Sequence, residues 1–107
     1  MEPALLHKLI LMINYERVVM RRSTDEIVRR YTEMSQETAL WLREHGITRM
    51  LTRPEIETVE TLVQVIDEEN EARGIKDKRA REMMIQNLKK DMQGMRTTAA
   101  ERAAEMR

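Results

Sequence analysis

One stripe of side chains at helical spacing runs through residues 23–47, and it constrains the fold more than any other feature. Its members recur at steps of four and three: Ile27, Tyr31, Met34, Thr38, Trp41 and His45. Such steps place side chains on one face of an α-helix. Ser23 and Glu26 have the spacing of a capping box at its start, and Gly46 supplies a stop. The pattern predicts helix around the single tryptophan.

This stripe is open to two interpretations. We favour one continuous helix from Ser23 to His45, because the period passes through Thr32–Met34 without a change of phase. The alternative is a helix-turn-helix with helices at Thr24–Tyr31 and Ser35–His45. The phrase SQETALWLREHGI resembles the recognition-helix half of small DNA-binding domains, and that resemblance implies contact with DNA. Turns of this kind often contain a glycine, and none stands at residues 32–34.

Helix-forming residues dominate the composition of this 107-residue chain, which has three glycines and two prolines. No segment of any length alternates in the manner of a strand. We therefore expect an all-α fold, a small bundle of three to four amphipathic helices. Pairing with a second copy of the chain would complete its core. One helical domain should span residues 1–96. A helix-prone, frayed tail should follow over residues 97–107.

The first helix should begin near Pro3, which suits a first helical turn. A broad apolar face follows it: Leu5, Leu6, Leu9, Ile10, Met12 and Ile13. The register of this helix continues into the stripe, so that the first two helices could form one rod. We favour a break near Arg22–Thr24, because the capping box at Ser23 marks a new start.

Two further helices follow. Thr52 and Glu55 repeat the capping-box spacing at the start of a helix expected over Arg53–Arg73, and Gly74 can close its end. The last helix should begin near Lys76 or Asp77. The flanks of the turn carry opposite charges: Asp67, Glu68, Glu69 and Glu71 before it, and Lys76, Lys78, Arg79 and Arg81 after it. The helix dipole disfavours acidic residues at the end of a helix and basic residues at the start of one. We therefore predict an antiparallel hairpin in the C-terminal half, in which the two clusters face and neutralise each other.

The sequence lacks the residues and spacings of common reactive sites. There is no cysteine, and His7 and His45 have no ligand partner at helical spacing. The acidic run at residues 67–71 lacks the pattern of a calcium loop, and no glycine-rich loop could hold a phosphate. Ser23 and Ser35 lack the flanking glycines of a nucleophile elbow. We therefore expect no enzymatic activity, no cofactor and no metal site.

A small protein without disulfides fits the cytoplasm, which is the location that we expect. No apolar run approaches the roughly eighteen residues of a membrane span. The opening Ala4–Ile13 is interrupted by His7 and Lys8 and lacks a small-residue cleavage site, so we do not interpret it as a signal peptide.

These exclusions favour a non-catalytic helical interaction module, an adaptor, regulator or assembly subunit that forms a homodimer or docks on a larger protein. Aromatic and methionine side chains are its candidate contacts, because tryptophan is enriched at interfaces and methionine adapts to varied surfaces. We assign to the interface Tyr31, Met34, Trp41, Leu42, Met84, Met92 and Met95. Trp41 is placed there rather than in the core of one chain because the helices offer more apolar face than one thin bundle covers. Neither a membrane nor a small-molecule substrate is expected.

Nucleic acid is the alternative partner. Nineteen basic and nineteen acidic residues cancel, so the net charge does not imply strong attraction to polyanions. The protein would then use the helix-turn-helix described above or be a helical subunit of a nucleoprotein complex. The candidate phosphate contacts are the basic residues with the fewest partners on their own helix: Arg21, Arg22, Lys89 and Lys90.

Overall fold

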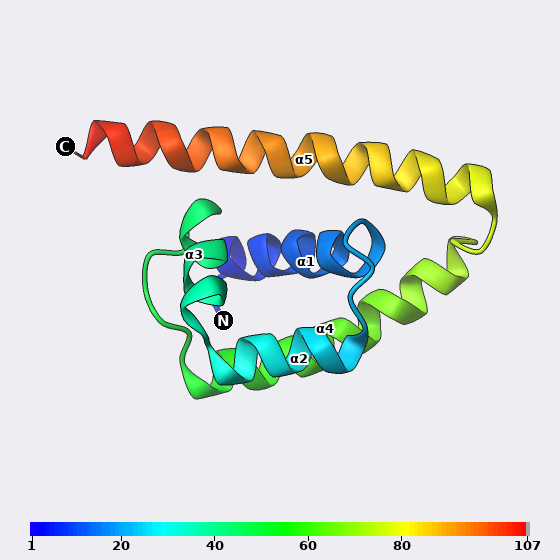
Figure 1. The fold of residues 1–107 in the computed structure, drawn as a ribbon, viewed down its shortest axis with the longest axis horizontal. Helices are drawn as coiled ribbons and strands as arrows, with labels where there is room; N and C mark the ends of the chain where they lie inside the picture. The colour runs from blue at the N-terminus through cyan, green and yellow to red at the C-terminus, as the bar shows by residue number, and fades with distance from the viewer. Residues whose placement is uncertain (107) are drawn as a thin grey trace.

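Five α-helices make up the described part of the chain, residues 1–106 of the computed structural model (Figure 1). They are α1 (Pro3–Val18), α2 (Thr24–Glu33), α3 (Gln36–Glu44), α4 (Arg53–Ala72) and α5 (Lys78–Glu105). The all-α prediction is confirmed, with five helices where three to four were expected. Arg107, the last residue of the predicted tail, lies outside the described residues.

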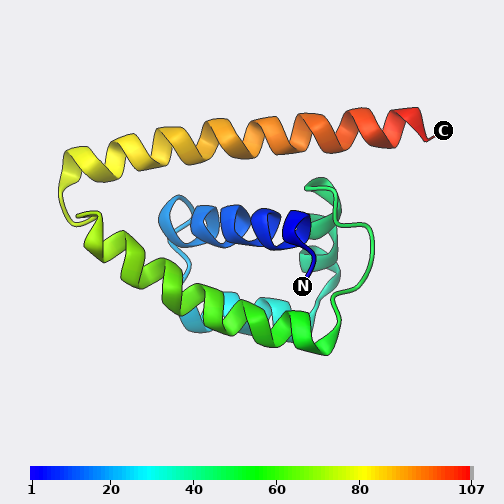
Figure 2. The ribbon, with the colours of Figure 1, turned by 180° about the vertical axis from the view of Figure 1, so that it is seen from behind.

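The helix α1 lies at the centre of the fold. Figures 1 and 2 show it between α5 on one side and α2 with α4 on the other, and it packs on all three. Pro3 occupies its first turn, where a backbone N–H would have no helical partner. Its buried apolar residues are Leu5, Leu9, Met12, Ile13 and Val18. A helix enclosed from two sides needs a wide apolar face, and the sequence of α1 supplies one.

The chain breaks between α1 and α2, as predicted. α1 ends at Val18, and Arg21 takes a left-handed backbone conformation with a φ of 58°. Ser23 then caps α2, since its Oγ accepts a hydrogen bond from the backbone N–H of Glu26 at 3.1 Å. The single rod that the register would allow does not form.

The predicted continuous helix over residues 23–45 is wrong. α2 ends one residue before Met34, which adopts a left-handed conformation with a φ of 45°. Ser35 then caps α3 by accepting from the backbone N–H of Thr38 at 3.3 Å. A left-handed conformation costs a non-glycine residue about 1–2 kcal/mol. We attribute its persistence to this cap and to the burial of Trp41 that the change of direction permits.

The start and end predicted for α4 and the start predicted for α5 are confirmed to within a residue or two. Glu55 completes a capping box at the start of α4, since its carboxylate accepts from the backbone N–H of Thr52 at 2.8 Å. Gly74 takes a φ of 75° in the turn that follows α4. Asp77 caps α5 by accepting from the backbone N–H of Ala80 at 3.0 Å.

The predicted α4–α5 hairpin is wrong in its packing. The chain reverses direction after Gly74, but α1 lies between the two helices and each of them packs on α1 (Figures 1 and 2). Among the described residues, no ion pair joins the acidic end of α4 to the basic start of α5. Asp67 pairs instead with Arg17 of α1 at 3.0 Å. Attraction between solvated charge clusters is weakened by water and salt, so the apolar face of α1 determines the arrangement.

The helix α5 continues to Glu105, through most of the tail that the sequence predicts to fray. Between Thr97 and Met106, Ala99 is the one residue shielded from solvent, and only in part. Little burial therefore stabilises this end of α5, and its fraying in solution stays a prediction.

Candidate functional site

A series of buried polar side chains crosses the core from α1 to α5. Its members are Glu16, Tyr31, Trp41, His45 and Arg96, and we name it the buried polar chain. Glu16 has no exposed surface. Arg22 donates to its Oε1 at 2.8 Å, Nε of Arg30 lies 3.5 Å from the same oxygen, and the Tyr31 hydroxyl donates to its Oε2 at 2.9 Å. Two cations and a hydroxyl compensate one buried carboxylate, as the burial of a charge requires.

The buried polar chain continues from Tyr31 to α5. Trp41 donates its indole N–H to the Tyr31 hydroxyl at 3.1 Å, and the Trp41 carbonyl oxygen lies 2.6 Å from Nδ1 of His45. Arg96 of α5 donates its Nε–H to Nε2 of His45 at 3.1 Å. The Arg96 guanidinium also lies 5.9 Å from the ring centroids of Tyr15 and Trp41, within the range of a cation–π contact. This end of the chain therefore connects α3 to α5.

Burial shifts the pKa of three members. Desolvation raises the pKa of Glu16, although the Tyr31 hydroxyl and the two arginines favour its charged form. Burial, followed by the charge of Glu16, raises the pKa of Tyr31 well above its ordinary 10.0. Burial likewise lowers the pKa of His45 from its ordinary 6.5. No member lines the open pockets that lie between α1 and α5, between α2 and α4, and between α1 and the end of α4. These groups bind one another inside the core.

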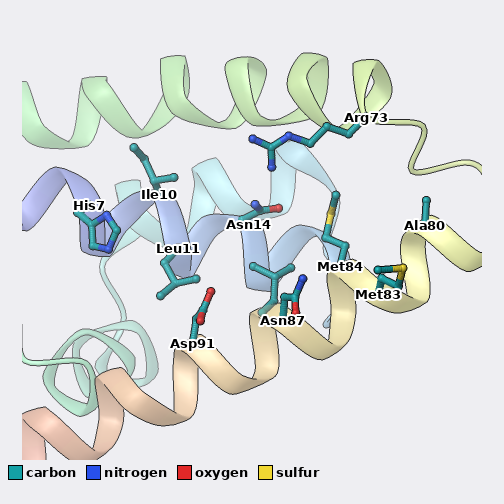
Figure 3. Close-up of a pocket in the computed structure, with 11 residues that line it drawn as sticks. His7, Ile10, Leu11, Asn14, Arg73, Ala80, Met83, Met84, Asn87 and Asp91 are labelled. Carbon is teal, nitrogen blue, oxygen red and sulfur yellow. The ribbon is translucent and has the colours of Figure 1, made fainter.

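An open groove of about 530 Å³ lies between α1, the end of α4 and the first half of α5 (Figure 3). We name it the α1–α5 groove. Its apolar lining comes from α1 and α5: Ile10, Leu11, Ala80, Met83, Met84 and Leu88. Polar side chains complete the lining: His7, Asn14, Arg73, Asn87 and Asp91. A mainly apolar groove with a few polar groups has the character of a binding site.

Two apolar side chains at the groove are exposed to water. Met83 is 62% exposed and Ile10 is 38% exposed. Single exposed apolar residues are common on protein surfaces, but these two come from different helices and border one groove. The groove is therefore a place where α1 and α5 leave apolar surface uncovered.

The predicted interface residues divide between the core and the surface. Four are buried within the chain and present no surface to a partner while this fold persists: Tyr31, Trp41, Leu42 and Met92. Three are half-buried: Met34, Met84 and Met95. Trp41 therefore belongs to the core of one chain, contrary to the prediction. Met84 is the one predicted interface residue that lines the groove.

The sequence interpretation missed Ile10 and Met83 as surface residues. Ile10 follows Leu9, and Met83 precedes Met84, so each belongs to an adjacent pair of large apolar residues. The side chains of two adjacent residues in a helix point in different directions, so only one of the two can pack against the same neighbouring helix. This spacing was the available signal that α1 and α5 carry more apolar surface than one core can cover.

The predicted nucleic-acid contacts have different environments. Arg21 is exposed, and so are Lys89 and Lys90 on α5. Arg22 donates to the buried carboxylate of Glu16. Arg22 as a phosphate contact stays a prediction, but its side chain is only 16% exposed and one of its donors already serves Glu16. The partner of Arg22, Glu16, lies on α1. The sequence prediction considered only ion pairs within one helix and therefore missed it.

Within residues 1–106, no three His, Cys, Asp or Glu side chains gather in an arrangement that could hold a metal ion. In the same residues no helix has the length and apolar character needed to cross a membrane. Comparisons with protein families, with curated proteins and with solved structures find no match to this chain. A functional proposal must therefore rest on the geometry of the molecule.

Proposed function

We propose that this protein is a non-catalytic interaction module that pairs with a second copy of itself through the α1–α5 groove. The observation that carries the proposal is the exposure of Met83 and Ile10 at one groove of about 530 Å³. Apolar surface gathered in a groove is removed from water when a partner fills it, and this favours association. Methionine contributes a flexible side chain that adapts to the shape of a partner.

Charge supports a second copy as the occupant. Residues 51–75, which include α4, hold two basic and seven acidic residues, a net charge of −5. Residues 76–107, which include α5, hold nine basic and five acidic residues, a net charge of +4. The charged residues that line the groove itself have opposite signs: Arg73, just after α4, and Asp91 on α5. A two-fold axis there would let Arg73 of each copy meet Asp91 of the other, so that both contacts join opposite charges.

Sedimentation equilibrium tests the proposal with a matched pair of variants. Met83→Glu places a charge at the groove, whereas Met50→Glu places the same charge at a methionine of nearly equal exposure, 64% against 62%, that does not line it. The wild type and Met50→Glu should sediment as dimers and Met83→Glu as a monomer. A Met83→Glu variant that still pairs would contradict the groove as the interface.

A wild type that stays monomeric at every concentration would contradict self-pairing. The remaining occupant would then be a larger protein. Photo-crosslinking from a probe amino acid at position 83 would identify it, and the cross-link should be absent when the same probe stands at position 50. Equal cross-linking from the two positions would exclude the groove as a specific site.

Nucleic acid is the second candidate, favoured by the turn at Met34. The break there gives α2 and α3 the two-helix arrangement of the alternative interpretation. The exposed charges of α3 are Glu37 and Glu44 beside Arg43, whereas a recognition helix needs a positive surface. We expect weak binding to duplex DNA, measured by fluorescence anisotropy across a salt series. Tight binding that weakens steeply with salt, and less steeply in Arg21→Ala, would favour this candidate over pairing.

A further inference from the structure

Few contacts hold the C-terminal end of α5. Leu88 and Met92 are buried on the part of α5 that packs on α1, but between residues 96 and 106 only Arg96 and Ala99 are partly shielded from water. Figures 1 and 2 show α5 passing over α3, with its last turns running on beyond α3. The contact between α3 and α5 therefore depends largely on Arg96, whose partner is His45.

The hydrogen bonds of His45 determine the state of both ring nitrogens. The Trp41 carbonyl oxygen, 2.6 Å from Nδ1, is an acceptor, so Nδ1 carries a proton. Nε2 accepts from the Nε–H of Arg96 at 3.1 Å and must present a lone pair. The residue has no exposed surface, so water does not replace either partner. Only the neutral ring with its proton on Nδ1 satisfies both contacts.

We propose that His45 and Arg96 form a proton-operated latch, which holds the turn of α5 at residues 96–99 against α3 while His45 is neutral and releases this turn when His45 is protonated. A proton on Nε2 would point at the N–H of Arg96, so that two donors and two positive charges would meet. Release moves Arg96 away and uncovers the rings of Tyr15 and Trp41, over which its guanidinium lies. The latch goes beyond pairing through the groove and does not depend on it.

The charged groups around His45 give the direction of the switch. Arg96 faces it from α5, and Lys8 of α1 lies nearby, with its Nζ 3.3 Å from the carbonyl oxygen of Gly46. Glu44 of α3 favours protonation but is exposed to water. Burial and then the charge of Arg96 lower the pKa of His45 in the latched state, and release returns it toward 6.5. The released state therefore binds the proton more tightly, and its population grows as the pH falls below 6.5.

Hydrogen exchange measured by mass spectrometry at about pH 7.5 and about pH 5 tests the latch. After correction for the intrinsic pH dependence of exchange, amides 97–100 should lose about tenfold in protection at the lower pH, whereas those of α1 keep theirs. His45→Gln should abolish this response, because its amide oxygen can accept from Arg96 but does not titrate. His7→Gln is the matched control, since His7 is the other histidine of the chain and is exposed. It should respond as the wild type does.

Arg96→Ala keeps the test decisive if His45→Gln does not fold. This variant should leave amides 97–100 unprotected at both pH values. It should also raise the pKa of His45 followed by NMR, because a neighbouring cation is removed. Protection of these amides that persists in Arg96→Ala would overturn the proposal. So would wild-type protection that is equal at the two pH values, or that is lost equally throughout the chain, which would indicate acid unfolding.

Discussion

The side of α1 that faces α2 and α3 is covered by the rest of the chain, whereas the side that faces the groove leaves apolar surface exposed to water. We call these the closed side and the open side. On the closed side, Glu16 and Tyr31 have no exposed surface and are hydrogen-bonded to each other. On the open side, Ile10 and Met83 keep 38% and 62% of their surface exposed. The closed side stabilises the single chain, because the carboxylate of Glu16 and the hydroxyl of Tyr31 are both hydrogen-bonded there, although the buried Nε of Arg30 has no hydrogen-bond partner. The open side can gain stability only by association, because its apolar surface still faces water.

The largest expected effect of a substitution lies on the closed side. Trp41→Ala should lower the free energy of unfolding by about 3–5 kcal/mol, because it removes a buried indole and leaves a cavity. Urea unfolding in a Met83→Glu background measures this loss without a contribution from pairing. A Trp41→Ala variant as stable as its parent would return Trp41 to the interface role that the sequence predicts.

A smaller effect on the same side isolates one hydroxyl. Tyr31→Phe removes the hydroxyl that donates to Glu16 and that accepts from the Trp41 indole N–H. It should therefore lower the free energy of unfolding by about 2 kcal/mol. Tyr15→Phe is the control, because the Tyr15 hydroxyl makes no hydrogen bond among the described residues, and it should cost less than about 0.5 kcal/mol. Equal losses in the two variants would show that the buried polar chain adds nothing to ordinary packing.

The capping carboxylate of α4 gives a pH-dependent effect away from the groove. Arg49 donates to Glu55 at 2.8 Å, and this pair with the Thr52 N–H lowers the pKa of Glu55 from 4.5 to about 2. A lowered pKa in the folded state means that stability present at neutral pH is lost as the pH falls from 4.5 toward 2. Glu55→Gln keeps the cap but not the charge. It should cost about 1 kcal/mol at neutral pH, since Arg49 is half exposed and water screens the pair.

Thermal or urea unfolding across this pH range checks the prediction for Glu55. The difference in stability between the wild type and Glu55→Gln should shrink toward zero as the pH approaches 2. A difference that stays constant with pH would mean that the ion pair with Arg49 contributes nothing and that the cap alone matters.

The smallest expected effect on the single chain lies on the open side. Met83→Glu should change the free energy of unfolding by less than about 0.5 kcal/mol, because the side chain is 62% exposed and loses little packing. Urea unfolding at a concentration low enough to keep the wild type monomeric provides the comparison. A loss of several kcal/mol would place Met83 in the core and would remove the distinction between the two sides.

Local signals in the sequence predict the helices better than the turns between them. Ser23 and Glu55 mark helix starts because a cap acts within one turn of its own helix. The turn at Met34 lacks a glycine, and the stripe keeps its phase through it, so periodicity alone indicates one helix. Ser35 was the available signal, since it caps α3 in the structure.

Contacts between helices were less predictable because they join residues far apart in the sequence. Glu16 continues the buried stripe of Leu5, Leu9 and Met12 at steps of four and three, which could have indicated its burial. Its partners Arg22 and Tyr31 follow no helical spacing from it. The charges around Gly74 predicted the wrong neighbour for α4, since α1 competes for the same face with apolar contacts.

Small-angle X-ray scattering over a concentration series tests most directly whether a second copy covers the open side of α1. One chain has a Cα radius of gyration of 14.1 Å. A compact pair should have a radius of about 17 Å, with twice the forward scattering of the single chain at equal mass concentration. We predict that the wild type and Met50→Glu reach the larger value as concentration rises, whereas Met83→Glu does not. A radius that stays near 14.1 Å at every concentration, or that rises equally in Met83→Glu, would contradict pairing through the groove.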